Sequence, residues 1–222
     1  MESNKDYIQN ISQTAERRFF ASEVRKLSPD NANDSEKKTS VIEGYAAKFN
    51  NETVIGRWFR EKISVGAFDD VLNDDVRCLF NHNPNFILAR CVAGKGTLSL
   101  SVDEIGLKYS YETPDRQYAR DLENAIETGD VNQSSFAFDI GEQVWYEVEG
   151  ELPLRDVKKF SVLYDVAPVT YPAYADTEVA KRSHSAHLEK LNPKPESLQT
   201  RSENNKELNA FDAQIIINSN LD

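Results

Sequence analysis

Histidine is the side chain best suited to act as a general base near neutral pH, and the sequence holds three, His82, His184 and His187. His82 follows the apolar run VRCLF and precedes an Asn-Pro turn, and functional side chains commonly occupy such strand ends. A hydrogen-bonded turn residue is the alternative interpretation of His82. The other two histidines lie in a polar C-terminal segment. Their i, i+3 spacing could hold a metal, but no neighbour adds ligands, so we expect no metal site.

Two serines, Ser134 and Ser135, stand at the start of the strand-like segment SFAFDI. A hydroxyl at the mouth of a β-core can act as a nucleophile if a base lies within hydrogen-bond reach, and an ordinary turn serine is the alternative. The sequence lacks the G-x-S-x-G elbow of α/β-hydrolases. Asp165, in the apolar stretch LYDVAPV, is the candidate for an acidic partner, because a carboxylate in an apolar strand is costly unless it is paired.

The elements that must position these residues are mostly strands. Strand composition occurs at 17–25, 41–50, 76–80, 97–102, 106–112, 135–140, 144–149 and 157–169. One helix is predicted after Asp115 as N-cap, with Tyr118, Leu122 and Ile126 on one face and Gly129 as its stop. This order favours a β-rich α+β fold, a β-barrel or sandwich surrounded by helices.

The length of 222 residues fits one domain with appendages. Residues 1–15 are polar and predict a flexible lead-in, and residues 16–182 form the expected single domain. Residues 183–222 are polar and lack apolar periodicity, which predicts a disordered tail. Within that tail, the apolar patch Ile215-Ile216-Ile217 is a candidate docking element.

Composition excludes several classes of function. The net charge is −11, and the excess of acidic residues lies in 1–180, so we expect no nucleic-acid partner. No apolar run reaches about 18 residues, so no membrane span is predicted. Cys78 and Cys91 sit in apolar stretches with no paired motif, which predicts buried, reduced thiols in a cytosolic protein.

Several segments, taken together in this order and with these gaps, resemble the prohead protease family of tailed bacteriophages, distant relatives of the herpesvirus assemblins. The resemblance runs from about Arg18 to about Arg182. It rests on FFASEVR, VIEGYAAKFN, EKISVGAFDDVL, LFNHNPNFILARCVAGKGTLSLSVDEIGLKYSYETPD, ARDLENAIETGDVNQSSFAF and LYDVAPVTYPAYADTEVAKR. It implies a herpesvirus-protease-like fold, with a closed or partly open β-barrel, helices around it and flexible terminal segments.

The resemblance also implies the roles of three residues. The histidine of the family's strand-end motif falls on His82, and the nucleophile, directly before a Phe-small-Phe triplet, falls on Ser135. The acidic residue of the last strand motif, commonly Glu in the family, falls on Asp165. The small residue of the triplet is Ala137, where glycine is commoner. No cofactor and no metal is implied.

The biology that the resemblance implies is the maturation of a phage procapsid. The expected activity is that of a serine endopeptidase that cleaves a scaffold protein, or a scaffolding segment of the major capsid protein, and itself. The expected location is the assembling procapsid in the cytoplasm of the bacterial host, and the expected assembly is a homo-oligomer such as a dimer. The alternative hypothesis, from another class, is a non-catalytic β-rich module for capsid assembly.

Overall fold

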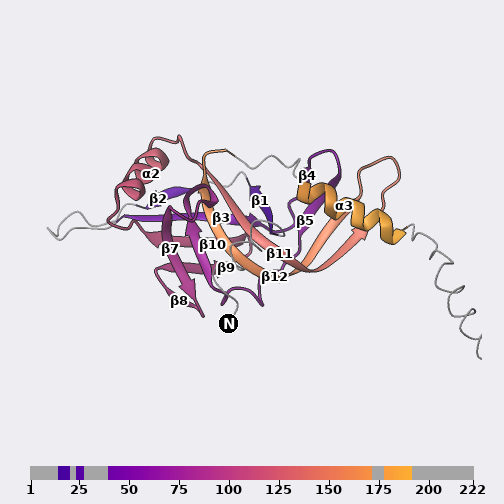
Figure 1. Cartoon of the computed structure of the whole chain (residues 1–222), viewed down its shortest axis with the longest axis horizontal. Helices are drawn as coiled ribbons and strands as arrows, with labels where there is room; N and C mark the ends of the chain where they lie inside the picture. The colour runs from indigo at the N-terminus through magenta and orange to yellow at the C-terminus, as the bar shows by residue number, and fades with distance from the viewer. Residues whose placement is uncertain (1–14, 21–23, 28–39, 172–177, 192–222) are drawn as a thin grey trace, which may run out of the picture. The chain divides into compact units, whose positions relative to one another are not determined.

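The structure, a computed structural model, describes residues 15–20, 24–27, 40–171 and 178–191, and its strands form two sheets (Figure 1). The larger sheet contains β1 (Glu16–Phe20), β4 (Thr53–Ile55), β5 (Phe59–Ile63), β6 (Val76–Leu79), β7 (Ile87–Val92), β8 (Lys95–Gly96), β11 (Gln133–Tyr146) and β12 (Leu154–Val169). The smaller sheet contains β2 (Arg25–Leu27), β3 (Val41–Lys48), β9 (Leu98–Val102) and β10 (Gly106–Glu112). The described helices are η1 (Phe80–His82), α2 (Gln117–Glu127) and α3 (Glu178–Leu191).

The larger sheet is organised around β12, which is buried along its C-terminal half. Its strand order is β1-β11-β12-β6-β7-β8, and β5 pairs in parallel with the N-terminal half of β12. The long antiparallel pair of β11 and β12 lies inside this sheet, between β1 on one side and β5 and β6 on the other (Figure 1). The C-terminal part of β12, from Leu163 to Val169, is apolar except for Asp165 and is buried throughout, as expected of a strand that is covered on both faces.

One hydrophobic core joins residues from both sheets. Ile42 of β3 and Leu107 of β10 belong to the same buried cluster as Phe136 of β11. This core contains a group of packed aromatic rings, in which the ring of Phe68 has its centroid 4.5 Å from that of Phe160. Phe68 comes from the turns that follow β5, so this core fixes a connecting segment as well as the strands.

The β-rich class predicted from the sequence is confirmed, but the predicted barrel is not found in the described residues. Both strand orders have two free ends, so neither sheet closes on itself. Strand composition predicts that strands form, but closure of a barrel depends on which strands pair. In the larger sheet β1 and β8 stand at opposite ends and do not pair with each other. The likeness to the herpesvirus protease fold stays a prediction.

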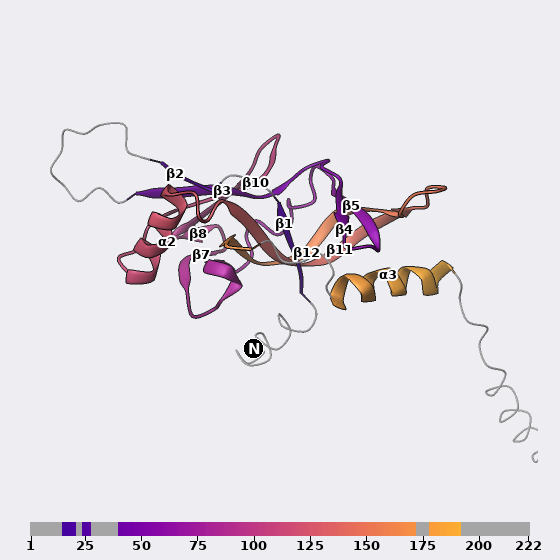
Figure 2. The same ribbon diagram turned by 90° about the horizontal axis from the view of Figure 1, so that it is seen from above.

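The predicted helix exists as α2 and lies at the β2 end of the smaller sheet (Figures 1 and 2). Its buried residues are Ala119, Leu122 and Ile126, which agrees with the predicted apolar face. The N-cap is Arg116 rather than Asp115, because the Asp115 carboxylate pairs with the Arg120 side chain instead of capping the helix. None of the described helices is long and apolar enough to cross a membrane.

The predicted boundaries of the domain fall partly outside the described residues. Of the lead-in, residues 1–14 lie outside them, and so do residues 192–222 of the predicted tail, including Ile215-Ile216-Ile217. Residues 183–191, which the sequence assigned to the tail, form the second part of α3. The domain limits of 16 and 182 therefore stay predictions.

The aromatic core gives the first testable prediction. Phe68→Ala should lower the free energy of unfolding by about 3–5 kcal/mol, because it removes a fully buried ring and leaves a cavity among other rings. Urea unfolding measures this change. The matched control is Val65→Ala, whose side chain is 67% exposed and should change stability by no more than about 0.5 kcal/mol. Equal stabilities of the two variants would show that Phe68 is not part of the core.

Candidate active site

Neighbouring strands of the larger sheet bring together the three residues predicted at the catalytic centre. Ser135 belongs to β11 and Asp165 to β12, and His82 ends η1, directly after β6. His82 Nδ1 lies 2.5 Å from Asp165 Oδ1, and His82 Nε2 lies 2.6 Å from Ser135 Oγ. The result is a continuous chain of carboxylate, imidazole and hydroxyl, an arrangement that can activate a serine for acyl transfer.

The register of β11 against β12 places Ser135 and Asp165 on one face of the sheet. Ser135 pairs with Ala167, and Ala137 pairs with Asp165. Directly opposite side chains point the same way, and residues two apart in a strand share a face, so all four lie on one side. The two alanines leave space on that side, where the His82 ring joins the carboxylate to the hydroxyl.

The loop that carries His82 has an uncommon backbone conformation. Asn81 and His82 both have φ of 55°, in the left-handed region that only a few per cent of non-glycine residues adopt. The side chain of Asn81 stabilises it, because its Oδ1 accepts from Thr170 N at 2.9 Å and its Nδ2 donates to Thr170 Oγ1 at 3.0 Å. Thr170 directly follows β12, so the strand that carries Asp165 also fixes the loop that carries His82.

Ser134 points away from this site, although it is the direct neighbour of Ser135. Its Oγ lies 2.9 Å from the hydroxyl of Tyr109, in the smaller sheet. Burial, with a smaller contribution from Cys78, raises the pKa of Tyr109 far above its usual value, so that phenol stays neutral. Ser134 is therefore part of the contact between the sheets, and only Ser135 can reach the histidine.

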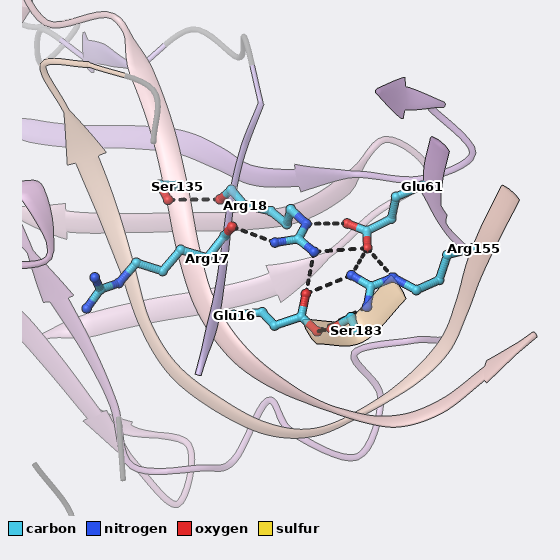
Figure 3. A network of polar contacts seen from close by, with 7 residues as sticks. All are labelled: Glu16, Arg17, Arg18, Glu61, Ser135, Arg155 and Ser183. Carbon is cyan, nitrogen blue, oxygen red and sulfur yellow. Dashed lines mark hydrogen bonds and ion pairs between the residues drawn. The ribbon is translucent and has the colours of Figure 1, made fainter. Parts of the chain in front are cut away.

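The hydroxyl of Ser135 is completely shielded from solvent, with an exposed fraction of 0%. The side chains of His82 and Asp165 are 8% and 5% exposed. Besides His82, Ser135 Oγ contacts the main chain of β1, because it donates a hydrogen bond of 2.8 Å to the carbonyl oxygen of Arg18 (Figure 3). In this state β1 covers Ser135.

Both cysteines are free and buried, as predicted. Cys78 precedes the histidine loop in β6, and Asp165 lies near enough to influence its thiol. Burial first, and the charge of Asp165 second, raise the pKa of Cys78 well above its ordinary value. The thiol therefore stays protonated at neutral pH.

A buried cluster of four charged side chains lies beside the site (Figure 3). Arg18 donates to Glu61 Oε1 from Nε at 2.6 Å, and Arg155 donates to Glu61 Oε2 from Nε at the same distance. Glu16 binds both arginines, and its Oε1 also accepts from Ser183 Oγ at 2.9 Å. The guanidinium of Arg155 is 4.7 Å from the centroid of the Phe59 ring. Each charge therefore has a partner of opposite sign, which a buried cluster requires.

The contacts within this cluster stabilise the ionised forms of Glu16 and Arg155. Burial by itself raises the pKa of Glu16, but the charges of Arg18 and Arg155 and the hydrogen bonds from Arg155 and Ser183 outweigh it and lower that pKa from 4.5 to about 2. Burial lowers the pKa of Arg155, but the two carboxylates raise it above its usual value. Both groups are fully ionised at neutral pH.

Other residues near the site were not predicted from the sequence. No sequence motif marks Asn81, Arg18, Glu61 or Arg155. A charged residue at a buried position of a strand is nevertheless a usable signal, as Glu61 illustrates. Of the histidines set aside, His184 lies in α3 rather than in an unstructured tail, with its ring centroid 5.9 Å from that of Trp58.

The comparison with protein families gives a match to one family model. The family model described as caudovirus prohead serine protease matches residues 27–190 of the 222, more than half of the chain. The chain belongs to this family. Ser135, His82 and Asp165 all lie inside the matched segment, and the family resemblance inferred from the sequence is confirmed.

Two further comparisons concern solved structures and curated proteins. The solved structure of the capsid assembly protease of bacteriophage T4 is similar to this chain with a TM-score of 0.40 and 13% sequence identity, over 71% of this chain and 99% of that one. Among curated proteins there is no match. The assignment to the prohead serine proteases therefore rests on the family model.

The lowered pKa of Glu16 predicts acid sensitivity of the fold. A carboxyl group whose pKa is lower in the folded state than in the unfolded state stabilises the fold at any pH above the unfolded-state pKa. This stabilisation is lost as the pH falls through the folded-state pKa. The contribution, about 3 kcal/mol, should be complete above about pH 4.5 and be lost toward pH 2. The stability difference between wild type and Glu16→Gln, measured by urea unfolding, should therefore shrink between pH 4.5 and pH 2.

Val65→Ala is the control for this measurement, because its stability difference from wild type involves no titrating group and should not vary over the same range. A difference for Glu16→Gln that stays constant down to pH 2 would mean that the cluster does not hold Glu16 ionised.

Proposed function

We propose that this chain is a serine endopeptidase with Ser135 as nucleophile, His82 as general base and Asp165 as the carboxylate that orients the histidine. The observation that carries the proposal is the hydrogen-bond chain from Asp165 through His82 to Ser135, with links of 2.5 and 2.6 Å. Membership of the prohead serine protease family supports the same reaction.

The mechanism follows from the order of these contacts. Asp165 accepts the Nδ1 proton of His82, which leaves Nε2 free to take the hydroxyl proton of Ser135 as Oγ bonds to the scissile carbonyl carbon. The protonated Nε2 then gives that proton to the leaving amine as the peptide C–N bond breaks. A water molecule, deprotonated by Nε2, hydrolyses the acyl-enzyme and restores Ser135. Low exposure of His82 and Asp165 strengthens the attraction between imidazolium and carboxylate in this cycle.

We infer a role in capsid maturation from the family. The substrate that fits it is a scaffold protein, or a scaffolding segment of the major capsid protein, inside an assembling procapsid in the bacterial cytoplasm. Cleavage of the chain itself and a homo-oligomeric assembly belong to the same hypothesis. The reaction as written uses only side chains of this chain and water, with no metal or cofactor in any step.

The alternative is a non-catalytic module for capsid assembly. Such a module needs strands and a core, but it has no use for a buried imidazole between a carboxylate and a serine. Taking an imidazole and a carboxylate out of water costs free energy that their mutual hydrogen bonds offset only in part, so apolar side chains would serve a purely structural core at least as well. The 2.6 Å contact between His82 and Ser135 therefore favours the enzyme.

Ser135→Ala gives the first test of the function. When the chain is co-expressed with its capsid or scaffold protein, the variant should lower the rate of fragment formation by about 10⁶-fold, as expected when a triad loses its nucleophile. Mass spectrometry of the fragments measures this. Ser134→Ala is the matched control, equally buried but bonded to Tyr109, and it should still cleave. Full activity in both variants would exclude a serine protease.

The second test concerns His82 and Asp165. His82→Ala should be as severe as Ser135→Ala, and the double variant should be no worse, because the residues act as a unit. Asp165→Asn keeps the shape but should cost about 10⁴-fold, since an amide favours the wrong orientation or tautomer of the ring. Cleavage rates from a quantified time course separate these cases. A loss below about tenfold in Asp165→Asn would assign the orienting role to another group.

A further inference from the structure

We propose that Asn81 is a positioning residue for the reaction, and that it fixes the backbone of His82 so that the imidazole stands between Asp165 and Ser135. The observation that carries this inference is the side chain of Asn81, directly before His82, which is bonded to the main-chain N–H and the hydroxyl of Thr170. The inference rests on the proposed function, because it names a further residue of the same site.

His82 is held at two points of the same segment of chain. Its ring is bound by Asp165 in β12, and its backbone is held through Asn81 by Thr170, which directly follows β12. The register of β11 against β12 places Ser135 opposite the stretch between these two points. The position of the imidazole relative to the hydroxyl therefore depends on both attachments.

The side chain of Asn81 continues the link between β6 and β12 where the main chain of β6 ends. The two strands pair in parallel as far as Cys78 and Val166, and β6 ends at Leu79. Beyond that point Asn81 Oδ1 accepts from Thr170 N at 2.9 Å, and Asn81 Nδ2 donates to Thr170 Oγ1 at 3.0 Å. An amide side chain has an acceptor and a donor as a peptide unit has, so it can replace one in such a link.

The backbone at this position also suits asparagine. Asn81 has φ of 55° and ψ of 32°, and His82 has φ of 55° as well. Side chains with a Cβ disfavour this left-handed region, but asparagine tolerates it better than most residues do. Asn81 thus contributes both a tolerated backbone and two hydrogen bonds. Glycine would keep the first contribution and remove the second, which makes the two separable.

The exposure of Asn81 distinguishes a positioning role from a stabilising one. Asn81 is exposed, whereas the side chain of His82 is buried. Hydrogen bonds of an exposed side chain replace bonds to water, so they add little to the stability of the fold. They still fix an orientation, and a small misplacement of a catalytic group lowers the rate strongly. Loss of these bonds should therefore slow the reaction far more than it destabilises the protein.

Cleavage of the co-expressed capsid or scaffold protein by Asn81→Gly tests the effect on the rate. This variant should be slower by about 10²-fold, while its urea midpoint stays near that of wild type. Asn81→Asp keeps oxygen acceptors for the N–H and the hydroxyl of Thr170 and tolerates the same backbone, so it should stay within about tenfold of wild type. Both rates come from a quantified time course.

Tyr118→Phe is the matched control at the other end of the same loop. It removes the hydrogen bond of 2.6 Å from the Tyr118 hydroxyl to the carbonyl oxygen of Ile87, which Arg116 continues to bind. One hydrogen bond of the loop is lost, as in the test variant, but its site is five residues from His82. This control should cleave at the wild-type rate.

The proton between His82 Nδ1 and Asp165 gives a readout that does not depend on activity. A proton in a short hydrogen bond to a carboxylate is strongly deshielded, so its nuclear magnetic resonance lies far downfield. The sequence holds three histidines, and isotope-labelled histidine together with His82→Ala assigns the signal. Spectra of the full chain are taken with Ser135→Ala, which prevents self-cleavage by the proposed mechanism. In this background Asn81→Gly should lose the signal or move it upfield, while Asn81→Asp and Tyr118→Phe should keep it.

The combined results separate the inference from the proposed function. Unchanged cleavage and an unchanged proton signal in Asn81→Gly would overturn the inference and leave the protease intact. Slow cleavage with an unchanged signal would overturn it too, because Asn81 would then act on the substrate and not through His82. A urea midpoint that falls in step with the rate would make Asn81 a structural residue only, and no downfield signal with Asn81 in place would remove the geometry that the inference starts from. A signal that depends on Asn81, in a chain without Ser135-dependent fragments, would overturn the proposed function itself.

Discussion

A carboxylate inside a buried strand must be paired, and the arrangement of the site depends on how this protein pairs Asp165. The strand β12 lies between β11 and β6, so Asp165 has Ser135 on one side and the histidine loop on the other. Its partner is the imidazole of His82, 2.5 Å away, and the left-handed loop that delivers this ring is fixed by Asn81 to the residue after β12. The charge that would destabilise the strand by itself thus fixes the orientation of the His82 ring.

The second buried group of charges has a different role. Glu61 and Arg155 belong to the sheet, whereas Glu16 and Arg18 arrive with β1, and both pairs are neutral by themselves. Buried ion pairs are poor sources of net stability, but they discriminate strongly between correct and incorrect partners. In this protein the contacts of Glu16 and Arg18 with Glu61 and Arg155 fix where β1 lies against β11, beside Ser135.

The sequence predicted the parts of this site that residue type and order reveal. Asp165 stands out in an apolar run, and the family resemblance located His82 and Ser135. Pairing of strands is a property of the whole chain, which is why the barrel was predicted and two open sheets were found. Glu61 could have been recognised, since Phe59 and Ile63 share its strand face and are buried. The carbonyl of Arg18 could not, because every residue has a carbonyl group and only the fold shows which one meets Ser135.

The proposed reaction requires that Ser135 forms a covalent acyl-enzyme during cleavage of a capsid or scaffold protein. Acid quenching of the reaction within its first turnover, followed by digestion and mass spectrometry, tests this directly. The peptide containing Ser135 is expected to carry, as an acyl group, the substrate fragment that ends at the scissile bond, and this adduct should disappear as product accumulates. Product formation while the Ser135 peptide stays unmodified at every time point would contradict it.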